Sequence, residues 1–415
     1  MEKSGRNTTG YAGLILLAVV LAGSCRPGEP RLEVGAVEFS TAAWSVGPNL
    51  VAAPNGRVIL TWLEPAGDET HALKFAVRDS AGWSQPGTIR ESDRFFVNWA
   101  DFPSLAQLAG GEWMVHWLEK VDVGTYAYHV KLAISSDEGE TWSEPFAPHR
   151  DQSATEHGFV SMVPLSDGGA AVVWLDGRQM AEERAGGEHE GLELGEMSLR
   201  ATTVSVPGEL GEDVLLDSRT CECCQTALVQ AADGLVAAYR DRGPSEIRDI
   251  AVSRHIDNRW TEPVVVSNDE FYYPGCPVNG PQLAANGDDV VIAWYTAPEQ
   301  NARTYVAFSQ DGGATFGSRI QIDDGDPLGR VDVELLADGT AIVAWLERTE
   351  TAADVRVRLV KSDGWMGAPL AVSETSESRG SGFPRMARAG DEIVIAWTLT
   401  GDDGGVRAAA VQVDR

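Results

Sequence analysis

The segment Trp113-Met114-Val115-His116-Trp117-Leu118-Glu119 is a short apolar run built around a tryptophan. Similar runs recur along the chain, and their characteristic aromatic residues are Trp62, Trp117, Trp174, Tyr239, Trp294, Trp345 and Trp397. The gaps between them are 55, 57, 65, 55, 51 and 52 residues. A repeat of this length, rich in short strands and in Gly and Asp turns, is typical of a β-propeller. We therefore predict an all-β fold that consists of a single propeller.

Each repeat begins with a recognisable opening segment. The seven openings are Pro48-Asn49-Leu50, Phe102-Pro103, Gly158-Phe159, Cys223-Cys224-Gln225, Gly280-Pro281, Gly329-Arg330 and Phe383-Pro384. The last repeat has chain for only three strands, whereas an additional strand at 36–43 precedes the first repeat. Pairing of that strand with the last repeat would close the ring and remove an exposed edge. We predict seven four-stranded blades closed in this way, with six blades as the alternative.

The N-terminus has the pattern of an export signal. Lys3 and Arg6 precede an apolar run at 11–22, and Gly23-Ser24 lead to Cys25. Small residues directly before a cysteine resemble a bacterial lipobox, so residues 1–24 are predicted to be a lipoprotein-type signal peptide and Cys25 the lipidation site. We assign 25–34 to a tether and 35–415 to the propeller. The protein is expected to be exported and lipid-anchored at the cell envelope, at the outer membrane or facing the periplasm; plain secretion is the alternative.

The net charge of the chain limits the classes of partner that it is expected to bind. The formal net charge is −29, which argues against binding to nucleic-acid phosphates or to anionic lipid surfaces. We therefore expect no nucleic-acid partner, membrane contact only through the lipid anchor, and a monomer.

Two turn segments share one pattern. Residues 135–142 read S-S-D-E-G-E-T-W and residues 309–316 read S-Q-D-G-G-A-T-F. Both match S-x-D-x-G-x-T followed by an aromatic residue, and in this they resemble the Asp box, or BNR repeat, of the sialidase superfamily. The resemblance implies a propeller in which these turns are structural and lie on the face away from the active site.

The position of these turns within the repeat locates a site. If they join the third and fourth strands of a blade, the opening segments and the second-to-third loops lie at the other face, around the channel mouth. A concave site is expected there. Within 239–249, three arginines and three carboxylates fall close together, and guanidinium groups bind carboxylates bidentately. We predict a ligand with a carboxylate, such as an acidic glycan; a network of ion pairs that braces the loop is the alternative.

The sialidase resemblance implies roles for residues on this face. In sialidases an arginine triad holds the substrate carboxylate, a Tyr–Glu pair is the nucleophile, and an Asp is the acid/base. The candidates for the carboxylate clamp are Arg178, Arg240, Arg242, Arg248, Arg330 and Arg385. The candidates for acid or base are Asp101 and Asp241, and for the nucleophile pair Glu246 with Tyr272 or Tyr273. The sequence lacks the early Phe/Tyr-Arg-Ile-Pro motif of those enzymes, so a non-catalytic scaffold for envelope proteins is the alternative.

Four further cysteines, Cys221, Cys223, Cys224 and Cys276, are predicted to meet at the channel mouth. In an exported protein an even number of cysteines indicates disulfides, here two bridges with three alternative pairings. Thiolates joined by His157 could instead bind copper(I) or zinc. Apart from this metal, no cofactor is expected.

Overall fold

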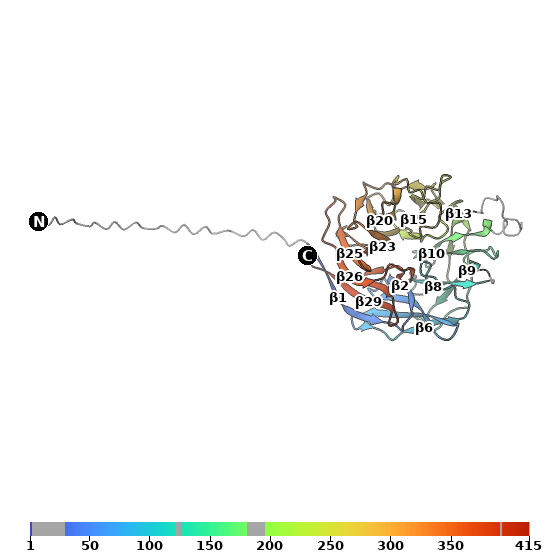
Figure 1. Cartoon of the computed structure of the whole chain (residues 1–415). Coiled ribbons are helices and arrows are strands. Elements are labelled where there is room, and N and C mark those ends of the chain that lie inside the picture. The colour runs from blue at the N-terminus through green and yellow to red at the C-terminus, as the bar shows by residue number, and fades with distance from the viewer. Residues whose placement is uncertain (2–29, 122–123, 125, 181–195, 391, 415) are drawn as a thin grey trace.

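The computed structural model describes residues 1, 30–121, 124, 126–180, 196–390 and 392–414. In these residues seven antiparallel sheets are arranged around a central axis, as Figure 1 shows. The predicted seven-bladed propeller is confirmed. No helix of the described residues has the length and apolar character needed to cross a membrane.

Each blade begins at the axis and ends at the rim. The first strands contact one another around the axis; they are β2 (Val46–Ala52), β7 (Ser104–Gln107), β10 (His157–Pro164), β14 (Ala227–Gln230), β19 (Gln282–Asn286), β23 (Pro327–Leu335) and β27 (Arg385–Ala389). The second strands are β3 (Val58–Pro65), β8 (Trp113–Lys120), β11 (Ala170–Asp176), β15 (Leu235–Arg240), β20 (Asp289–Thr296), β24 (Ala341–Arg348) and β28 (Glu392–Leu399).

The third strands are β4 (His71–Asp79), β9 (Tyr128–Ser135), β12 (Ser198–Val204), β16 (Ile250–Ile256), β21 (Arg303–Ser309), β25 (Ala353–Val360) and β29 (Gly405–Asp414). The outer strands are β1 (Arg31–Ser40), β5 (Gly82–Trp83), β6 (Gly87–Ser92), β13 (Val214–Asp217), β17 (Arg259–Trp260), β18 (Val264–Val265), β22 (Ile320–Gln321) and β26 (Leu370–Thr375). In the second blade the outer position is reduced to Phe146, which pairs with Leu132. Two short 3-10 helices, η1 (Pro298–Gln300) and η2 (Arg379–Ser381), lie in loops.

The seven recurring aromatic residues all lie in second strands, as predicted. Each is at most 2% exposed, because a second strand is covered on both faces by neighbouring blades. A hydrogen-bond acceptor stabilises a buried indole N–H. For four of the six tryptophans the sequence supplies one two residues later; for example, Trp174 donates to Asp176 at 2.8 Å and Trp345 donates to Glu347 at 2.7 Å. Trp294 donates instead to Asp269, and Trp397 Nε1 has no partner among the described residues.

The N-terminal strand closes the ring. The last sheet has the order β1-β29-β28-β27, and its outer register pairs Arg31 with Asp414. The predicted closure is therefore confirmed, although β1 begins at Arg31, inside the stretch assigned to the tether. The strand starts earlier because Leu32 and Val34 pack against the apolar core of the last two blades.

The two S-x-D-x-G-x-T turns follow the third strands β9 and β21. In the first turn, Asp137 accepts hydrogen bonds from the backbone N–H and hydroxyl of Thr141, at 2.8 and 2.6 Å. Asp311 and Thr315 repeat this geometry at 2.9 and 2.6 Å. These bonds lower the pKa of Asp137 and of Asp311 to about 2. Because strands alternate in direction, these turns lie at the end of the blades opposite the second-to-third loops.

Candidate binding site at the propeller axis

Strand register places one side chain from each blade at an equivalent level of the central channel. In every blade this is the first-strand residue that pairs with the position just before the recurring aromatic residue. The seven residues are Asn49, Ser104, Ser161, Ala227, Gln282, Asp332 and Arg385. All but Ala227 are polar, and we call these six polar residues the axial ring.

Of this ring, only Arg385 is among the site residues predicted from the sequence. A signal was present, because Pro48, Pro103, Pro281 and Pro384 each stand directly before a ring residue. The prolines alone do not show that the residues after them face one channel. Only the strand register shows that.

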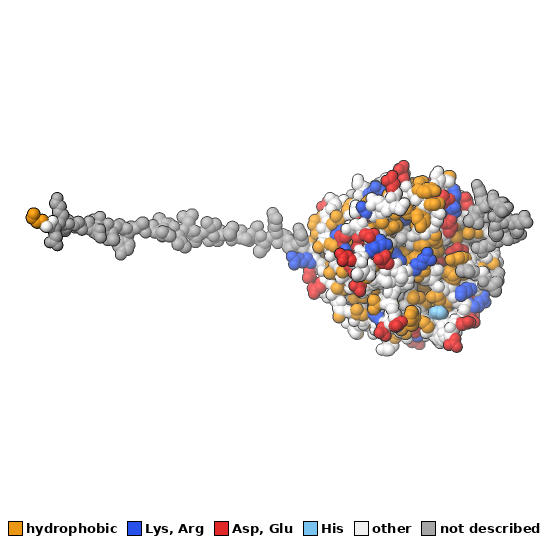
Figure 2. All heavy atoms as spheres, viewed as in Figure 1, with side chains coloured by type: hydrophobic (Ala, Val, Ile, Leu, Met, Phe, Trp, Pro, Cys, Tyr) orange, Lys and Arg blue, Asp and Glu red, His pale blue; other side chains and the backbone are white. Residues whose placement is uncertain are grey.

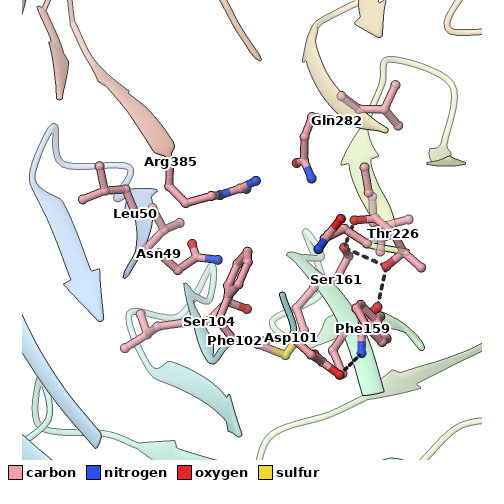
Figure 3. Close-up of a pocket in the computed structure, with 18 of the residues that line it drawn as sticks. Asn49, Leu50, Asp101, Phe102, Ser104, Phe159, Ser161, Thr226, Gln282 and Arg385 are labelled. Carbon is pink, nitrogen blue, oxygen red and sulfur yellow. Dashed lines mark hydrogen bonds between the residues drawn. The ribbon is translucent and has the colours of Figure 1, made fainter. Parts of the chain in front are cut away.

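Five ring residues line a cavity of about 160 Å³ at the axis. Figure 3 shows the side chains of Arg385, Asn49 and Gln282 pointing into this space from different blades. A water molecule occupies ≈ 30 Å³ in the liquid, so the cavity has room for roughly five waters or for a small polar group. It therefore suits a small ligand or the polar head of a larger one.

Arg385 is the charged donor of the cavity. Its Nη1 lies 3.3 Å from Asp332 Oδ1, and its side chain is 15% exposed. In the described part of the chain, neither Nε nor Nη1 of Arg385 has a hydrogen-bond partner. Asp332 is buried and accepts a hydrogen bond from the Met386 N–H at 2.6 Å. Burial raises the pKa of Asp332, and the charge of Arg385 opposes this shift.

Two amides accompany this guanidinium. Gln282 is 7% exposed and lines the cavity, as does Asn49. Neither side chain makes a hydrogen bond within the described residues. The ring serines differ: Ser104 lies 2.9 Å from His116 Nδ1, and Ser161 donates to the carbonyl of Thr226 at 2.9 Å. The cavity therefore contains two amides without hydrogen bonds among the described residues and one guanidinium that is ion-paired with Asp332.

Asp101 lies at the same cavity, next to the ring. It is 3% exposed and accepts a hydrogen bond from the Phe159 N–H at 2.8 Å. Burial raises the pKa of Asp101 well above its usual value. The hydroxyl of Tyr128 lies 3.5 Å from Asp101 and 2.6 Å from Glu156. Burial also raises the pKa of Tyr128, which keeps its phenol protonated.

The arginine-rich segment has a different arrangement from that of a free clamp. Arg240 is 1% exposed, and its guanidinium donates to three backbone carbonyls, those of Asn279, Arg248 and Tyr295. Burial lowers the pKa of Arg240 to about 10. This side chain ties blade four to blade five and lies against the ring of Phe271 at 5.3 Å.

Arg242 and Arg248 share two carboxylates. Glu222 pairs with Arg242 and, at 2.9 Å, with Arg248. Glu246 pairs with the same two arginines at 2.8 and 3.0 Å, and with Arg219 at 3.2 Å. The guanidinium charges of Arg242 and Arg248 are thus matched by carboxylates within the protein.

Arg178 and Arg330 also have partners. Arg178 pairs with Asp176 at 2.7 Å and with Asp213 at 2.9 Å. Arg330 donates to Ser381 Oγ at 2.7 Å and lies 4.9 Å from the ring of Trp99, and burial lowers its pKa to about 10. Of the six predicted arginines, Arg385 is the one that lines the axial cavity.

The remaining predicted catalytic residues lie away from the axis. Burial, and then the charge of Asp217, raise the pKa of Asp241 to about 6. Tyr272 and Tyr273 line a separate pocket of about 660 Å³. Tyr273 contacts Glu246 through the backbone, N–H to carbonyl at 3.0 Å, whereas the Glu246 carboxylate faces the arginines.

The four cysteines form two disulfides, Cys221–Cys224 and Cys223–Cys276, with Cα–Cα distances of 5.7 and 6.1 Å. The disulfide interpretation is supported, and the structure selects one of the three pairings. The sulfurs of Cys221, Cys223 and Cys224 lie within 4.8 Å of one another, so metal binding stays a prediction for the reduced protein.

His157, the predicted imidazole ligand of the metal, contacts two carboxylates and a second histidine. Its Nε2 lies 3.0 Å from Asp151 and 3.6 Å from Asp176, and its ring stacks on His149 at 4.2 Å between centroids. The predicted lipidation site Cys25 lies outside the described residues.

The face of the molecule seen in Figure 2 is of mixed charge. On the face seen in Figure 2, acidic side chains are interspersed with basic ones despite the large negative net charge.

No protein-family model matches the sequence, and no curated protein matches it. Among solved structures, the chain is similar to a protein of unknown function from Dyadobacter fermentans, with 13% identity and a TM-score of 0.52 over 94% of this chain and 100% of that one. It is also similar to the polysaccharide lyase Uly1, with 10% identity and a TM-score of 0.51 over 90% of this chain and 91% of that one. A mutant NanB sialidase from Streptococcus pneumoniae gives 11% identity and a TM-score of 0.47, over 93% of this chain and 95% of that one. The first two likenesses show a shared fold.

Proposed function

We propose that this protein binds an acidic glycan, or another small carboxylate, at the axial ring. The observation that carries the proposal is the cavity itself, where the Arg385 guanidinium and the amides of Asn49 and Gln282 converge without hydrogen bonds among the described residues. A guanidinium fork matches the two oxygens of a carboxylate, and amide N–H groups add donors around it. The fold, shared with a polysaccharide lyase, fits a glycan ligand.

Binding without hydrolysis fits the neighbouring groups better than catalysis. Next to the cavity, the Tyr128 hydroxyl lies 2.6 Å from Glu156 and 3.5 Å from the cavity residue Asp101. Tyr128 is 1% exposed and its pKa is raised by burial, so its phenol is neither accessible nor activated as a nucleophile. Glu246 and Tyr273 are separated from the cavity and engaged elsewhere.

The test of binding uses calorimetric titration of the protein with glucuronate, N-acetylneuraminate and glucose. We expect the two acids to bind and neutral glucose to bind far more weakly. Arg385→Gln removes a charged hydrogen-bond donor worth about 1.5–3 kcal/mol, so affinity for the acids should fall roughly 10- to 100-fold. Arg388→Gln is the matched control, because Arg388 lies on the same strand and donates to the carbonyls of Leu335 and Gly390.

Asp332→Asn provides a test of opposite sign. The amide keeps an acceptor for the Met386 N–H but removes the negative charge 3.3 Å from Arg385. Affinity for the acids should therefore rise in this variant. Equal affinity for glucose and glucuronate, or unchanged affinity in Arg385→Gln, would contradict the proposal.

We also propose that the protein is exported and anchored through a lipid on Cys25. The two disulfides support an oxidising compartment. In the native host, Cys25→Ser should move the protein from the membrane fraction to the soluble fraction and abolish incorporation of a labelled fatty acid. Retention of the label in Cys25→Ser would refute the assignment, and Cys276→Ser is the control, which should stay in the membrane fraction.

A further inference from the structure

The two disulfides are neighbours that differ in accessibility. Cys221 and Cys224 are 1% and 2% exposed, Cys223 is partly buried, and Cys276 is exposed. The sulfur of Cys223 lies 3.9 Å from that of Cys221. The outer disulfide, Cys223–Cys276, is therefore accessible to solvent and lies against the inner disulfide, Cys221–Cys224, which is buried.

The loop that carries three of these sulfurs is held by bonds other than the disulfides. The Cys221 N–H donates to the carbonyl of Arg240 at 3.0 Å. Glu222 is paired with Arg242 and Arg248. The side chain of Gln225 donates to the carbonyl of Ala100 at 2.7 Å and accepts from the Gly280 N–H at 3.1 Å. Opening of a disulfide should therefore leave the sulfurs of this loop close together.

We propose that the four cysteines form a thiol–disulfide exchange centre, in which the outer disulfide accepts two electrons from a dithiol and the inner disulfide then rearranges. Exchange requires a thiolate that can reach a disulfide sulfur. An external thiolate can reach the exposed Cys276, and the sulfur of Cys223 lies 3.9 Å from that of Cys221. The co-reactant is an external dithiol, of the kind carried by small dithiol reductants and by dithiol proteins.

The proposed exchange has two stages, reduction of the outer disulfide and rearrangement of the inner one. A thiolate of the dithiol attacks Cys276 Sγ; the Cys223–Cys276 bond breaks, and its electron pair leaves on Cys223. The second thiol of the dithiol then attacks the mixed disulfide and releases Cys276, so the dithiol is oxidised and the outer pair is reduced. The Cys223 thiolate next attacks Cys221, and the Cys221–Cys224 bond breaks with its electron pair on Cys224. Two protons from the dithiol end on Cys276 and Cys224, and one disulfide, Cys221–Cys223, remains.

The test is stepwise reduction of the folded, full-length protein with dithiothreitol, followed by alkylation in acid-quenched samples and peptide mass spectrometry. The first reduction event should give alkylated Cys224 and Cys276 with a linked Cys221–Cys223 pair. Alkylation of Cys223 and Cys276 with Cys221–Cys224 intact would overturn the proposal. So would resistance of both disulfides until the protein unfolds, as followed by near-UV circular dichroism.

A variant isolates the inner step. Cys276→Ser leaves Cys223 as a thiol without its partner, and exchange should distribute the free thiol between Cys223 and Cys224. Alkylation of Cys223 alone in this variant would refute the inner step. Cys223→Ser is the control: it leaves Cys276 free and removes the attacking sulfur, so alkylation should be confined to Cys276.

Discussion

Three histidine rings contact one another between the second and third blades. The ring centroids of His129 lie 4.8 Å from His149 and 4.9 Å from His157, and all three residues are at most 4% exposed. Burial, followed by the charge of His157, lowers the pKa of His149 to about 3, and burial lowers the pKa of His129. The residues come from β9, from the following loop and from β10, so their contact could not be read from sequence spacing.

This cluster predicts acid sensitivity. An unfolded histidine titrates near pH 6.5, whereas folded His149 takes a proton only near pH 3, so the unfolded state binds more protons between these values. Stability should therefore fall as the pH falls from about 6.5 toward 3. The pKa of Asp176 is lowered to about 2, so its contribution to stability is lost as the pH falls from about 4 to about 2, below both pH values of the measurement.

The measurement is the free energy of urea unfolding at pH 6 and pH 4.5 for the native protein and His149→Phe. Because His149→Phe lacks the group that takes up this proton on unfolding, the slope of the unfolding free energy against pH should fall by up to about 1.4 kcal/mol per pH unit. His255→Gln, at a half-buried position whose pKa is lowered less, should change the slope far less. An unchanged slope in His149→Phe would show that the cluster is not the source.

At the scale of elements, the opening segments of adjacent blades pack directly on one another. Gly280, before β19, donates its N–H to the Gln225 side chain at 3.1 Å. A Cβ on Gly280 would lie 1.9 Å from the Gln225 carbonyl oxygen. Glycine is needed here because backbone meets backbone, which no side-chain rotation can relieve.

Gly280→Ala should therefore destabilise the protein by about 1–3 kcal/mol, as overpacking in a core does. The measurement is the free energy of chemical unfolding. The control is Gly317→Ala, whose added Cβ would meet its nearest atom, the Phe308 carbonyl oxygen, at 3.5 Å. Equal stability of the two variants would mean that the opening segments can move apart without cost.

At the scale of the whole molecule, stability depends on how the first and last repeats are joined. Phe39 of β1 packs against Trp62 at 5.5 Å and Trp83 at 4.9 Å between ring centroids. These tryptophans belong to the first blade, whereas β1 belongs to the last. Phe39 therefore packs across the boundary between the last and first blades.

Phe39→Ala should lower the free energy of unfolding by about 2–3 kcal/mol, below the 3–5 kcal/mol typical of a fully buried phenylalanine because Phe39 is partly exposed. Val37→Ala on the same strand is the control, since Val37 is 52% exposed and should cost little. Urea unfolding followed by tryptophan fluorescence measures both. A loss in Val37→Ala as large as that in Phe39→Ala would indicate that general edge pairing, not this contact, closes the ring.

The fold was predictable because its signal is repeated: the strand with its aromatic residue recurs seven times, six times with Trp and once with Tyr239, and a period survives local variation. The site was less predictable because it is assembled from residues of different blades. Arg240 and Arg242 look alike in sequence, yet one donates to backbone carbonyls and the other pairs with Glu222 and Glu246. Asn49 and Gln282 each follow a proline, but only the strand register shows that they lie beside Arg385.

The pairing of Arg31 with Asp414 has a consequence for chain connectivity. Paired strands lie about 5 Å apart, so a short peptide could join these two ends of the described fold. The ring would then be continuous in covalent structure, and new termini could be opened at a hairpin of another blade, such as the turn at 135–142. In such a circular permutant any blade could come first in the chain while each keeps its neighbours in space.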